Sequence, residues 1–182
     1  KNNLMHKAEI ISIGSELLSG KAIDTTSSFI SRKLSSIGVV VTHKATIPDQ
    51  ASNIIKVVKQ SLNRSSILLI TGGLGPTKDD ITKKAVAKTL GLKMKHYPQG
   101  EASLRQFYKK LHKEMPRLTL NQAFLPEGSK PLKNSWGTAP GIYIKRQVAA
   151  TEWSFRSEVA NKKTCSKKKV LRGNRIKKKM LF

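Results

Sequence analysis

The residues best suited to chemistry lie in one segment, TGGLGPTKDDIT at residues 71–82. Its glycines have no Cβ and allow positive φ, so the backbone there can approach a ligand closely. Exposed amides in such a loop, together with the N-terminus of a following helix, bind phosphate oxygens. We therefore predict a phosphate-binding loop made of Thr71, Gly72, Gly73, Gly75, Pro76 and Thr77.

Two carboxylates stand beside this loop, Asp79 and Asp80. A carboxylate next to a bound phosphate repels it unless a divalent cation lies between them, so Mg²⁺ or a similar hard metal ion is the natural bridge. Thr77 and Asp80 also have the spacing of a helix capping box, which needs no ligand. The segment matches neither GxGxxG nor GxxxxGK[ST], so no standard nucleotide loop is indicated and both interpretations stay open.

Alternating elements must hold this loop in place. Short aliphatic runs predict buried strands at residues 8–13, 39–47, 67–70 and 92–96. Apolar residues at helical spacing predict helices at residues 25–37, 54–62, 81–90 and 101–115. This alternation indicates a three-layer α/β/α sandwich with a mostly parallel sheet.

Parallel sheets bind ligands outside the carboxyl ends of their strands, and the loops at residues 14–24 and 71–80 both leave from such ends. Glu16 and Asp24 flank the first loop and are candidate ligands of a metal ion or a ribose. An ordinary solvent-facing carboxylate is the simpler explanation of each. Lys78, Lys83 and Lys84 lie close to the second loop in the sequence and could neutralise a ligand, but surface lysines are common, so we expect them on the surface, where they favour solubility.

The charge of the chain is unevenly distributed. Its 182 residues carry a net charge of +24, and 38% of them are hydrophobic. Residues 145–182 hold 13 lysines and arginines against two acidic residues, with neither a strand nor a helix period. Blocks of like charge stay solvated. We predict a disordered, low-complexity basic tail at residues 145–182, which binds nucleic acid only non-specifically.

The composition also limits the compartment. No apolar run approaches the roughly 20 residues needed to span a bilayer, and the first residues lack the pattern of a secretory signal. The single cysteine, Cys165, excludes an internal disulfide and a zinc site built from cysteines. We expect a cytoplasmic protein without a membrane partner, and a homo-oligomer is left open.

Several motifs occur together in the order found in one known family. Besides TGGLGPTKDDIT, the chain contains IGSELLSG at residues 13–20, NQA at 121–123 and GTAPG at 137–141. Over residues 8–144 it thereby resembles the N-terminal domain of the competence/damage-inducible CinA family, which is related to MoaB/Mog-type molybdopterin-binding domains. The resemblance implies one domain of MoaB/Mog-like fold at residues 5–144.

The resemblance also implies a function, namely metal-dependent hydrolysis of the diphosphate bond of ADP-ribose or a similar dinucleotide. It assigns Asp49 and Asp80 to the metal ion and to catalysis, with Asp79 in support, and Gly14 to the ligand. A small phosphorylated, nucleotide-like molecule is the expected partner. Two alternatives stay open: molybdopterin binding or nucleotidyl transfer in molybdenum cofactor biosynthesis, and a non-catalytic or degraded binding module.

The resemblance ends abruptly near Ile144. Family members continue there into another strand and a Leu-Pro-Gly-Val-Pro-like turn, whereas this chain changes to lysine blocks. We therefore expect a domain that is truncated on its C-terminal side, with residues 145–182 read in a shifted frame or belonging to a degraded gene.

Overall fold

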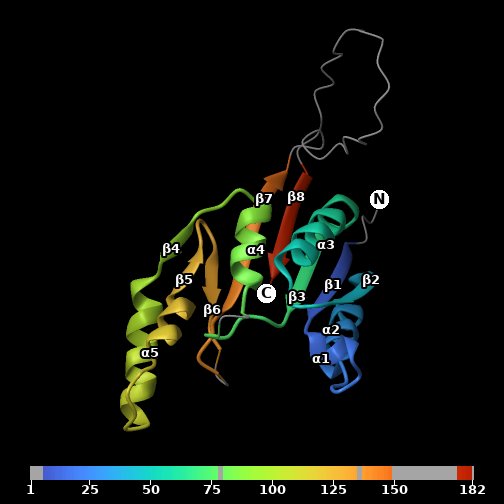
Figure 1. Ribbon diagram of the computed structural model, residues 1–182. Coiled ribbons are helices and arrows are strands. Elements are labelled where there is room, and N and C mark those ends of the chain that lie inside the picture. Colours follow the sequence, from blue (N-terminus) through green and yellow to red (C-terminus); the bar gives the residue numbers. More distant parts are fainter. Residues whose placement is uncertain (1–5, 78–79, 135–136, 149–175, 182) are drawn as a thin grey trace, which may run out of the picture.

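The fold is organised around one six-stranded sheet, in the order β2-β1-β3-β8-β7-β6 (Figure 1). The computed structural model describes residues 6–77, 80–134, 137–148 and 176–181. The strands of this sheet are β1 (Lys7–Ile13), β2 (Val40–Ile47), β3 (Ile67–Thr71), β6 (Lys130–Leu132), β7 (Gly141–Val148) and β8 (Ile176–Leu181). The first three lie within about one residue of the strands that the sequence predicts.

Most neighbouring strands run parallel. The pairs β2–β1, β1–β3 and β3–β8 are parallel, while β7 runs antiparallel to both β8 and β6. In register, Ile13 lies opposite Ile47 and Ser12 lies opposite Thr71. The carboxyl ends of β1, β2 and β3 therefore meet at one edge, and the predicted mostly parallel sheet is confirmed.

Helices cover both faces of this sheet. α3 (Ala51–Arg64) and α4 (Thr82–Thr89) pack on one face against alternate residues of β1. α2 (Thr25–Ser36) lies on the other face, because Ser12, which points to that face, donates a hydrogen bond to Asp24 immediately before α2. The predicted three-layer α/β/α architecture is thus confirmed.

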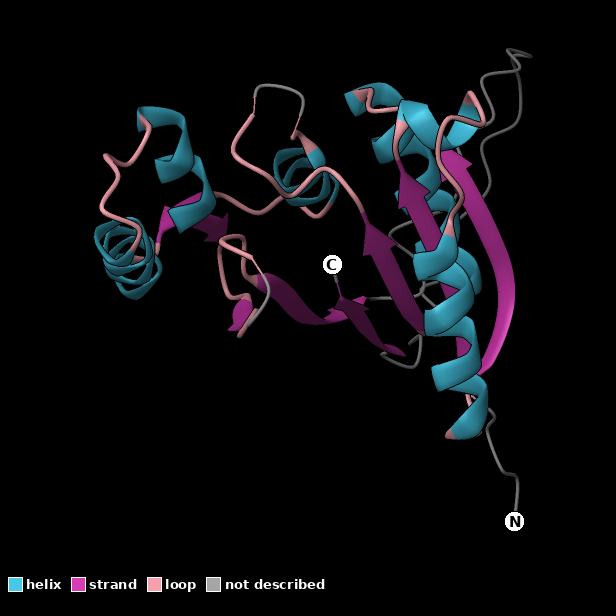
Figure 2. Cartoon of the chain, turned by 90° about the horizontal axis from the view of Figure 1, so that it is seen from below, coloured by secondary structure: helices cyan, strands magenta, loops and turns pink. Residues whose placement is uncertain are grey.

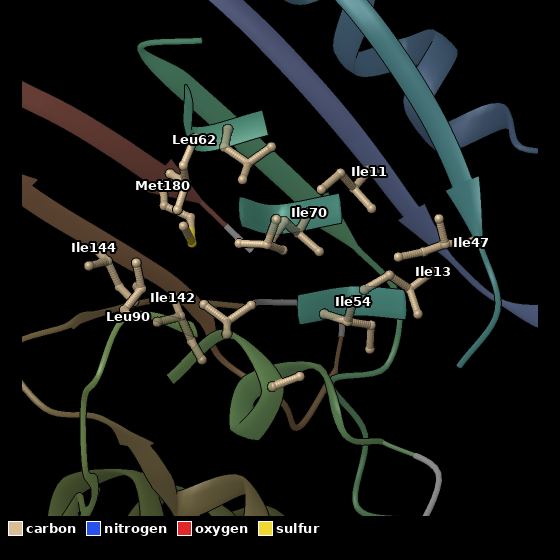
Figure 3. Packing of buried hydrophobic residues seen from close by; sticks show 14 of the residues in the cluster. Ile11, Ile13, Ile47, Ile54, Leu62, Ile70, Leu90, Ile142, Ile144 and Met180 are labelled. Carbon is tan, nitrogen blue, oxygen red and sulfur yellow. The ribbon is translucent and has the colours of Figure 1, made fainter. Parts of the chain in front are cut away.

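The hydrophobic core lies between the sheet and the layer of α3 and α4 (Figure 3). α3 contributes Ile54, Val58 and Leu62, whose spacing of four residues puts them on one face of the helix. They join a cluster that includes Ile11 of β1 and Ile70 of β3. Burial of each such side chain contributes about 1.5–3 kcal/mol. This packing fixes both ends of the loop that joins β3 to α4.

A smaller unit stands beside the main sheet, at the left of Figure 1 and of Figure 2. It contains β4 (Met94–His96), α5 (Pro98–Lys110), the 3-10 helix η1 (Arg117–Ala123) and β5 (Phe124–Pro126). β4 and β5 pair antiparallel in a two-stranded sheet of their own. This unit therefore forms a wall next to α4.

The helix predicted at residues 101–115 is displaced toward the N-terminus in the structure. It begins at Pro98, because proline suits the first position of a helix, where no amide partner is needed. It ends at Lys110, shortly before His112 adopts a φ of 51°. Within the described part of the chain, no helix is both long and apolar enough to cross a membrane.

The two ends of the expected basic tail belong to the sheet. β7 continues beyond Ile144 to Val148, and β8 inserts between β3 and β7, where Met180 is buried in the core. The sheet therefore extends beyond the boundary predicted at residue 144. Backbone hydrogen bonds to β3 and β7 hold β8 in place, although its side chains show no clear period. The disorder predicted for residues 149–175 lies outside the described residues.

Candidate functional site

Three loops meet where β1, β2 and β3 end, as the parallel topology predicts. The amide of Gly14 donates to the carbonyl oxygen of Ile47 at 3.0 Å, which ties the end of β1 to the end of β2. Oδ2 of Asp49 accepts a hydrogen bond from the amide of Ser15 at 2.9 Å, at the first residue of α1 (Ser15–Leu18). The structure brings Gly14 and Asp49 together, with the Asp49 carboxylate already bonded to backbone.

Two glycines after β3 are required by the packing of the loop itself. Gly72 has a φ of 93°, and a Cβ added there would overlap the carbonyl oxygen of Ile13. Gly73 has a φ of 63°, and its added Cβ would overlap Oγ1 of Thr82, which donates to the Gly72 carbonyl oxygen at 3.0 Å. These glycines let the loop approach β1 and α4, so they do not by themselves indicate a phosphate.

The carboxylates of the first loop have different surroundings. Asp24 caps α2, because its Oδ1 accepts from the Ser27 amide at 2.9 Å and its Oδ2 from the Ser12 hydroxyl at 2.6 Å. Burial raises the pKa of Asp24, but these hydrogen bonds outweigh it and hold the pKa below its ordinary value. Glu16 is exposed, and its carboxylate lies over Gly14. Helix capping therefore explains Asp24 without a ligand.

The later part of the glycine loop opens into a hollow of about 320 Å³, which we call the α4 hollow. The loop contributes Gly75, Thr77 and Asp80 to its lining, and α4 contributes Lys83 and Lys84. Residues of β4, η1 and β5 supply the remainder. The predicted site residues are thus divided: three share this hollow, while none of those at the ends of β1 and β2 lines it.

Asp80 has a protein partner inside the α4 hollow. Its Oδ2 accepts from the Thr77 amide at 2.8 Å and from the Thr77 hydroxyl at 2.5 Å. This is half of the predicted capping box, but α4 begins only at Thr82, and its N-cap residue, Ile81, provides no side-chain cap. The Thr77–Asp80 pair therefore stabilises the loop and does not cap the helix.

Lys83 is the residue of this hollow whose burial the sequence did not predict. The sequence predicts it on the surface, but the side chain is 5% exposed and its Nζ donates to the carbonyl oxygen of Asn121 at 2.8 Å. Burial lowers the pKa of Lys83 to about 8, against the opposing effect of Asp80. Lys84 is exposed, as expected. A buried lysine with a strongly shifted pKa in a hollow is a candidate functional group.

The described residues do not form a cage for a resident divalent metal ion. Within the described ranges, no three histidine, cysteine, aspartate or glutamate side chains come together as metal ligands would. Asp49 and Asp80, the predicted ligands, accept hydrogen bonds from different loops, and only Asp80 lines the α4 hollow. Asp79, like Lys78, lies outside the described residues.

Comparison with known proteins shows the family to which the chain belongs. A family model described as "Probable molybdopterin binding domain" matches residues 9–161. The chain belongs to this molybdopterin-binding domain family. It is 42% identical over 139 residues to a protein of Natranaerobius thermophilus named as competence-damage inducible, covering 76% of this chain and 34% of the relative. A protein of the same name from Clostridioides difficile is 39% identical over 140 residues, covering 77% and 34%. The CinA resemblance is confirmed.

A solved structure has the same architecture as this molybdopterin-binding-type domain. The crystal structure of CinA from Thermoplasma acidophilum, a protein with unknown function, is similar with a TM-score of 0.70 and 29% identity. The likeness covers 76% of this chain and 81% of that one. The chain spans about a third, 34%, of the length of the curated relatives it matches, so it corresponds to one part of those proteins.

Proposed function

We propose that the α4 hollow of this domain binds the phosphate or diphosphate group of a small ligand, of molybdopterin or nucleotide type. The observation that carries the proposal is Lys83, a cation that is only 5% exposed in the wall of a hollow of about 320 Å³. Small-molecule sites have volumes of this order. The family description and the glycine loop support the same class of ligand.

Lys83 supplies a charge that its protein partner satisfies only in part. The ammonium group has three N–H donors, and the Asn121 carbonyl oxygen, at 2.8 Å, accepts one of them. A phosphate oxygen is a stronger partner than a neutral carbonyl, because charge-assisted hydrogen bonds are roughly twice as strong. An anion would also favour the protonated lysine and thereby offset the effect of burial on its pKa.

The first turn of α4 adds neutral donors to this charge. The intrahelical pattern starts with the Ala85 amide, which donates to the Ile81 carbonyl oxygen at 2.9 Å. No side chain caps the helix at Ile81, so the amides of its first turn have no side-chain acceptor. An anion there also interacts favourably with the helix dipole. Lys83 and the helix start therefore favour the same negatively charged group.

Diphosphate hydrolysis of an ADP-ribose-type ligand is the second candidate function. It is favoured by Asp80, whose carboxylate lines the same hollow as Lys83. In this case Lys83 would hold the diphosphate while Asp80 accepts a proton from the attacking water. Molybdopterin binding and a non-catalytic binding role require the anion site alone. Turnover therefore separates hydrolysis from the other two functions.

The test is a calorimetric titration with inorganic pyrophosphate and with ADP-ribose. Lys83→Met should weaken pyrophosphate binding about ten- to 100-fold, because hydrogen bonds to charged groups contribute about 1.5–3 kcal/mol. Lys88→Met removes an exposed lysine of α4 outside the hollow and should change the affinity less than about twofold. Equal binding by Lys83→Met and the wild type would contradict the proposal. AMP release from ADP-ribose would establish hydrolysis.

The pKa of Lys83 gives this binding a pH dependence. The lysine is protonated below a pH of about 8 and loses its charge above it. Affinity for ADP-ribose should therefore be steady near pH 7 and fall by up to about tenfold per pH unit above 8. Lys83→Arg keeps its charge and should show a flat profile. A flat profile in the wild type would exclude Lys83 as the binding cation.

A further inference from the structure

Three residues that act on the Lys83 amine line the α4 hollow together with it. The carbonyl oxygen of Asn121 accepts from Nζ at 2.8 Å, and the charges of Asp80 and Lys84 act on its pKa. The Lys83 side chain is only 5% exposed, so it has almost no contact with solvent on the outer surface of α4. A reagent small enough for this hollow, of about 320 Å³, therefore reaches the amine from inside it.

Lys83 has a much larger share of neutral amine than an exposed lysine. Burial lowers its pKa to about 8, and the charge of Lys84 acts in the same direction. At pH 8 about half of the Lys83 amine is neutral, against about one part in 250 for a lysine with an ordinary pKa. The neutral amine has a free lone pair, and desolvated lysines of this kind serve as nucleophiles. Lys83 is therefore a nucleophile at a pH at which exposed lysines are almost entirely protonated.

The other groups of the hollow favour one class of electrophile. Lys84 adds a second cation to the lining, and the amides in the first turn of α4 have no side-chain acceptor. Both attract an anion such as phosphate. A phosphate held there keeps the group bonded to it beside Nζ, which raises the effective concentration of that group. An acyl phosphate combines the phosphate that suits the hollow with a carbonyl carbon that suits the amine.

We propose that Lys83 is a site of acylation, and that its reagent is a small acyl phosphate, such as acetyl phosphate, bound in the α4 hollow. The Nζ lone pair attacks the acyl carbon, and the bond between this carbon and the phosphate oxygen breaks. Inorganic phosphate leaves with the bonding electron pair and takes up the proton that the amine loses. The products are an amide at Lys83 and one inorganic phosphate. This inference rests on the phosphate site proposed above.

Acylation of Lys83 gives the phosphate site a means of regulation. An amide nitrogen is neutral and does not take up a proton near pH 7, so the modified side chain lacks the charge that attracts phosphate. The modification should weaken pyrophosphate binding about as much as Lys83→Met, which is about ten- to 100-fold. A bound ligand in turn keeps acyl phosphate out of the hollow. The supply of acyl phosphate and the occupancy of the site therefore control each other.

The test measures the acetylation rate of individual lysines after the whole protein is incubated with acetyl phosphate at pH 8. Peptide mass spectrometry, with fragment ions that separate Lys83 from Lys84, gives the rate at each position. Lys83 should react about tenfold or more faster than Lys88, an exposed lysine of α4 that does not line the hollow. Pyrophosphate at about ten times its Kd should slow the reaction of Lys83 about tenfold by mass action and leave Lys88 unaffected. Acetic anhydride carries no phosphate and should show a smaller preference for Lys83.

A variant without the amine connects the modification to binding. Lys83→Arg has no acylable amine, so treatment with acetyl phosphate should leave its pyrophosphate affinity at the value before treatment. The treated wild type should lose affinity about ten- to 100-fold. Equal rates at Lys83 and Lys88, faster acetylation of Lys84 than of Lys83, or no protection by pyrophosphate would each overturn the inference. If untreated protein binds pyrophosphate while Lys83 stays unreactive, the acylation is wrong and the phosphate site stands; without pyrophosphate binding, both are wrong.

Discussion

The strand-end loops and the α4 hollow differ in how far the protein satisfies its own polar groups. At the strand ends, Asp24 and Asp49 accept hydrogen bonds of 2.6–2.9 Å from backbone amides and a serine hydroxyl. In the α4 hollow, Lys83 has a neutral carbonyl oxygen as the hydrogen-bond acceptor for a full charge.

This difference separates groups that fold the chain from groups that are available to a ligand. In a sequence, carboxylates near a glycine-rich loop are natural candidates for ligand binding. In this structure, hydrogen bonds to nearby residues explain the positions of Asp24 and Asp49. A buried polar group that folding leaves incompletely satisfied requires another explanation. Substitutions at four positions test this contrast.

Gly72→Ala should have the largest effect, because Gly72 serves the fold. The new Cβ would overlap the carbonyl oxygen of Ile13, and alanine is strained at a φ of 93°. We expect the free energy of unfolding to fall by about 3 kcal/mol or more in urea titrations. Gly20→Ala is the matched control, since its φ is 72° but nothing lies within 4 Å of its added Cβ. It should cost only about 1–2 kcal/mol, and equal costs would contradict the packing role.

Asp24→Ala should destabilise the protein without affecting ligands. Loss of the cap on α2 should lower the free energy of unfolding by about 1–2 kcal/mol, with pyrophosphate affinity unchanged. Because the folded-state pKa of Asp24 is below its ordinary value, its contribution is present above that value and is lost as the pH falls through the folded pKa. Stability of Asp24→Asn should therefore fall less between about pH 5 and pH 2 than that of the wild type. Weakened pyrophosphate binding would show that Asp24 belongs to the site.

Lys83→Met should stabilise the protein while it weakens anion binding. The substitution removes a charge whose pKa burial lowers to about 8 and replaces it with an apolar side chain of similar length. We expect a gain of about 1–2 kcal/mol in thermal unfolding experiments near pH 7, since binding groups are commonly kept at a cost in stability. Loss of stability would mean that the hydrogen bond to Asn121 is structural.

Asp80→Asn should have the smallest effect. Asparagine retains an acceptor oxygen for Thr77, so stability should change by less than about 1 kcal/mol. Removal of one negative charge from the α4 hollow should tighten pyrophosphate binding by about two- to fivefold. If Asp80 instead accepts the proton of an attacking water, AMP release from ADP-ribose should fall by orders of magnitude. The two assays, run on the same variant, separate these roles.

Local patterns were sufficient to predict the central strands and the loops at their ends. The run ILLI at residues 67–70 is aliphatic and short, and Gly72 follows it at once, so strand and turn are both visible. Parallel pairing of β1, β2 and β3 then places the loops that follow them at one edge of the sheet, and this placement does not depend on the side chains of the loops. The convergence of Gly14, Asp49 and Gly72 at that edge follows from these facts.

The α4 hollow could not be predicted in the same way, because it depends on contacts between segments that are distant in the sequence. Lys83 is buried by the packing of α4 against the smaller unit, and its type alone indicates a surface residue. A signal was present, since Lys83 shares the helical spacing of the buried residues Val86 and Leu90.

The position of β8 has a consequence for the order in which the chain folds. β8 pairs Lys179 with Ile67 of β3 on one side and with Lys145 of β7 on the other. During synthesis, β1, β2 and β3 can assemble early, but the connection between this half and β7 must wait for residues 176–181. Contacts so distant along the chain slow folding. The nascent sheet therefore passes through a stage in which β3 and β7 both present an open edge, and a chaperone that shields those edges should raise the yield of folded protein.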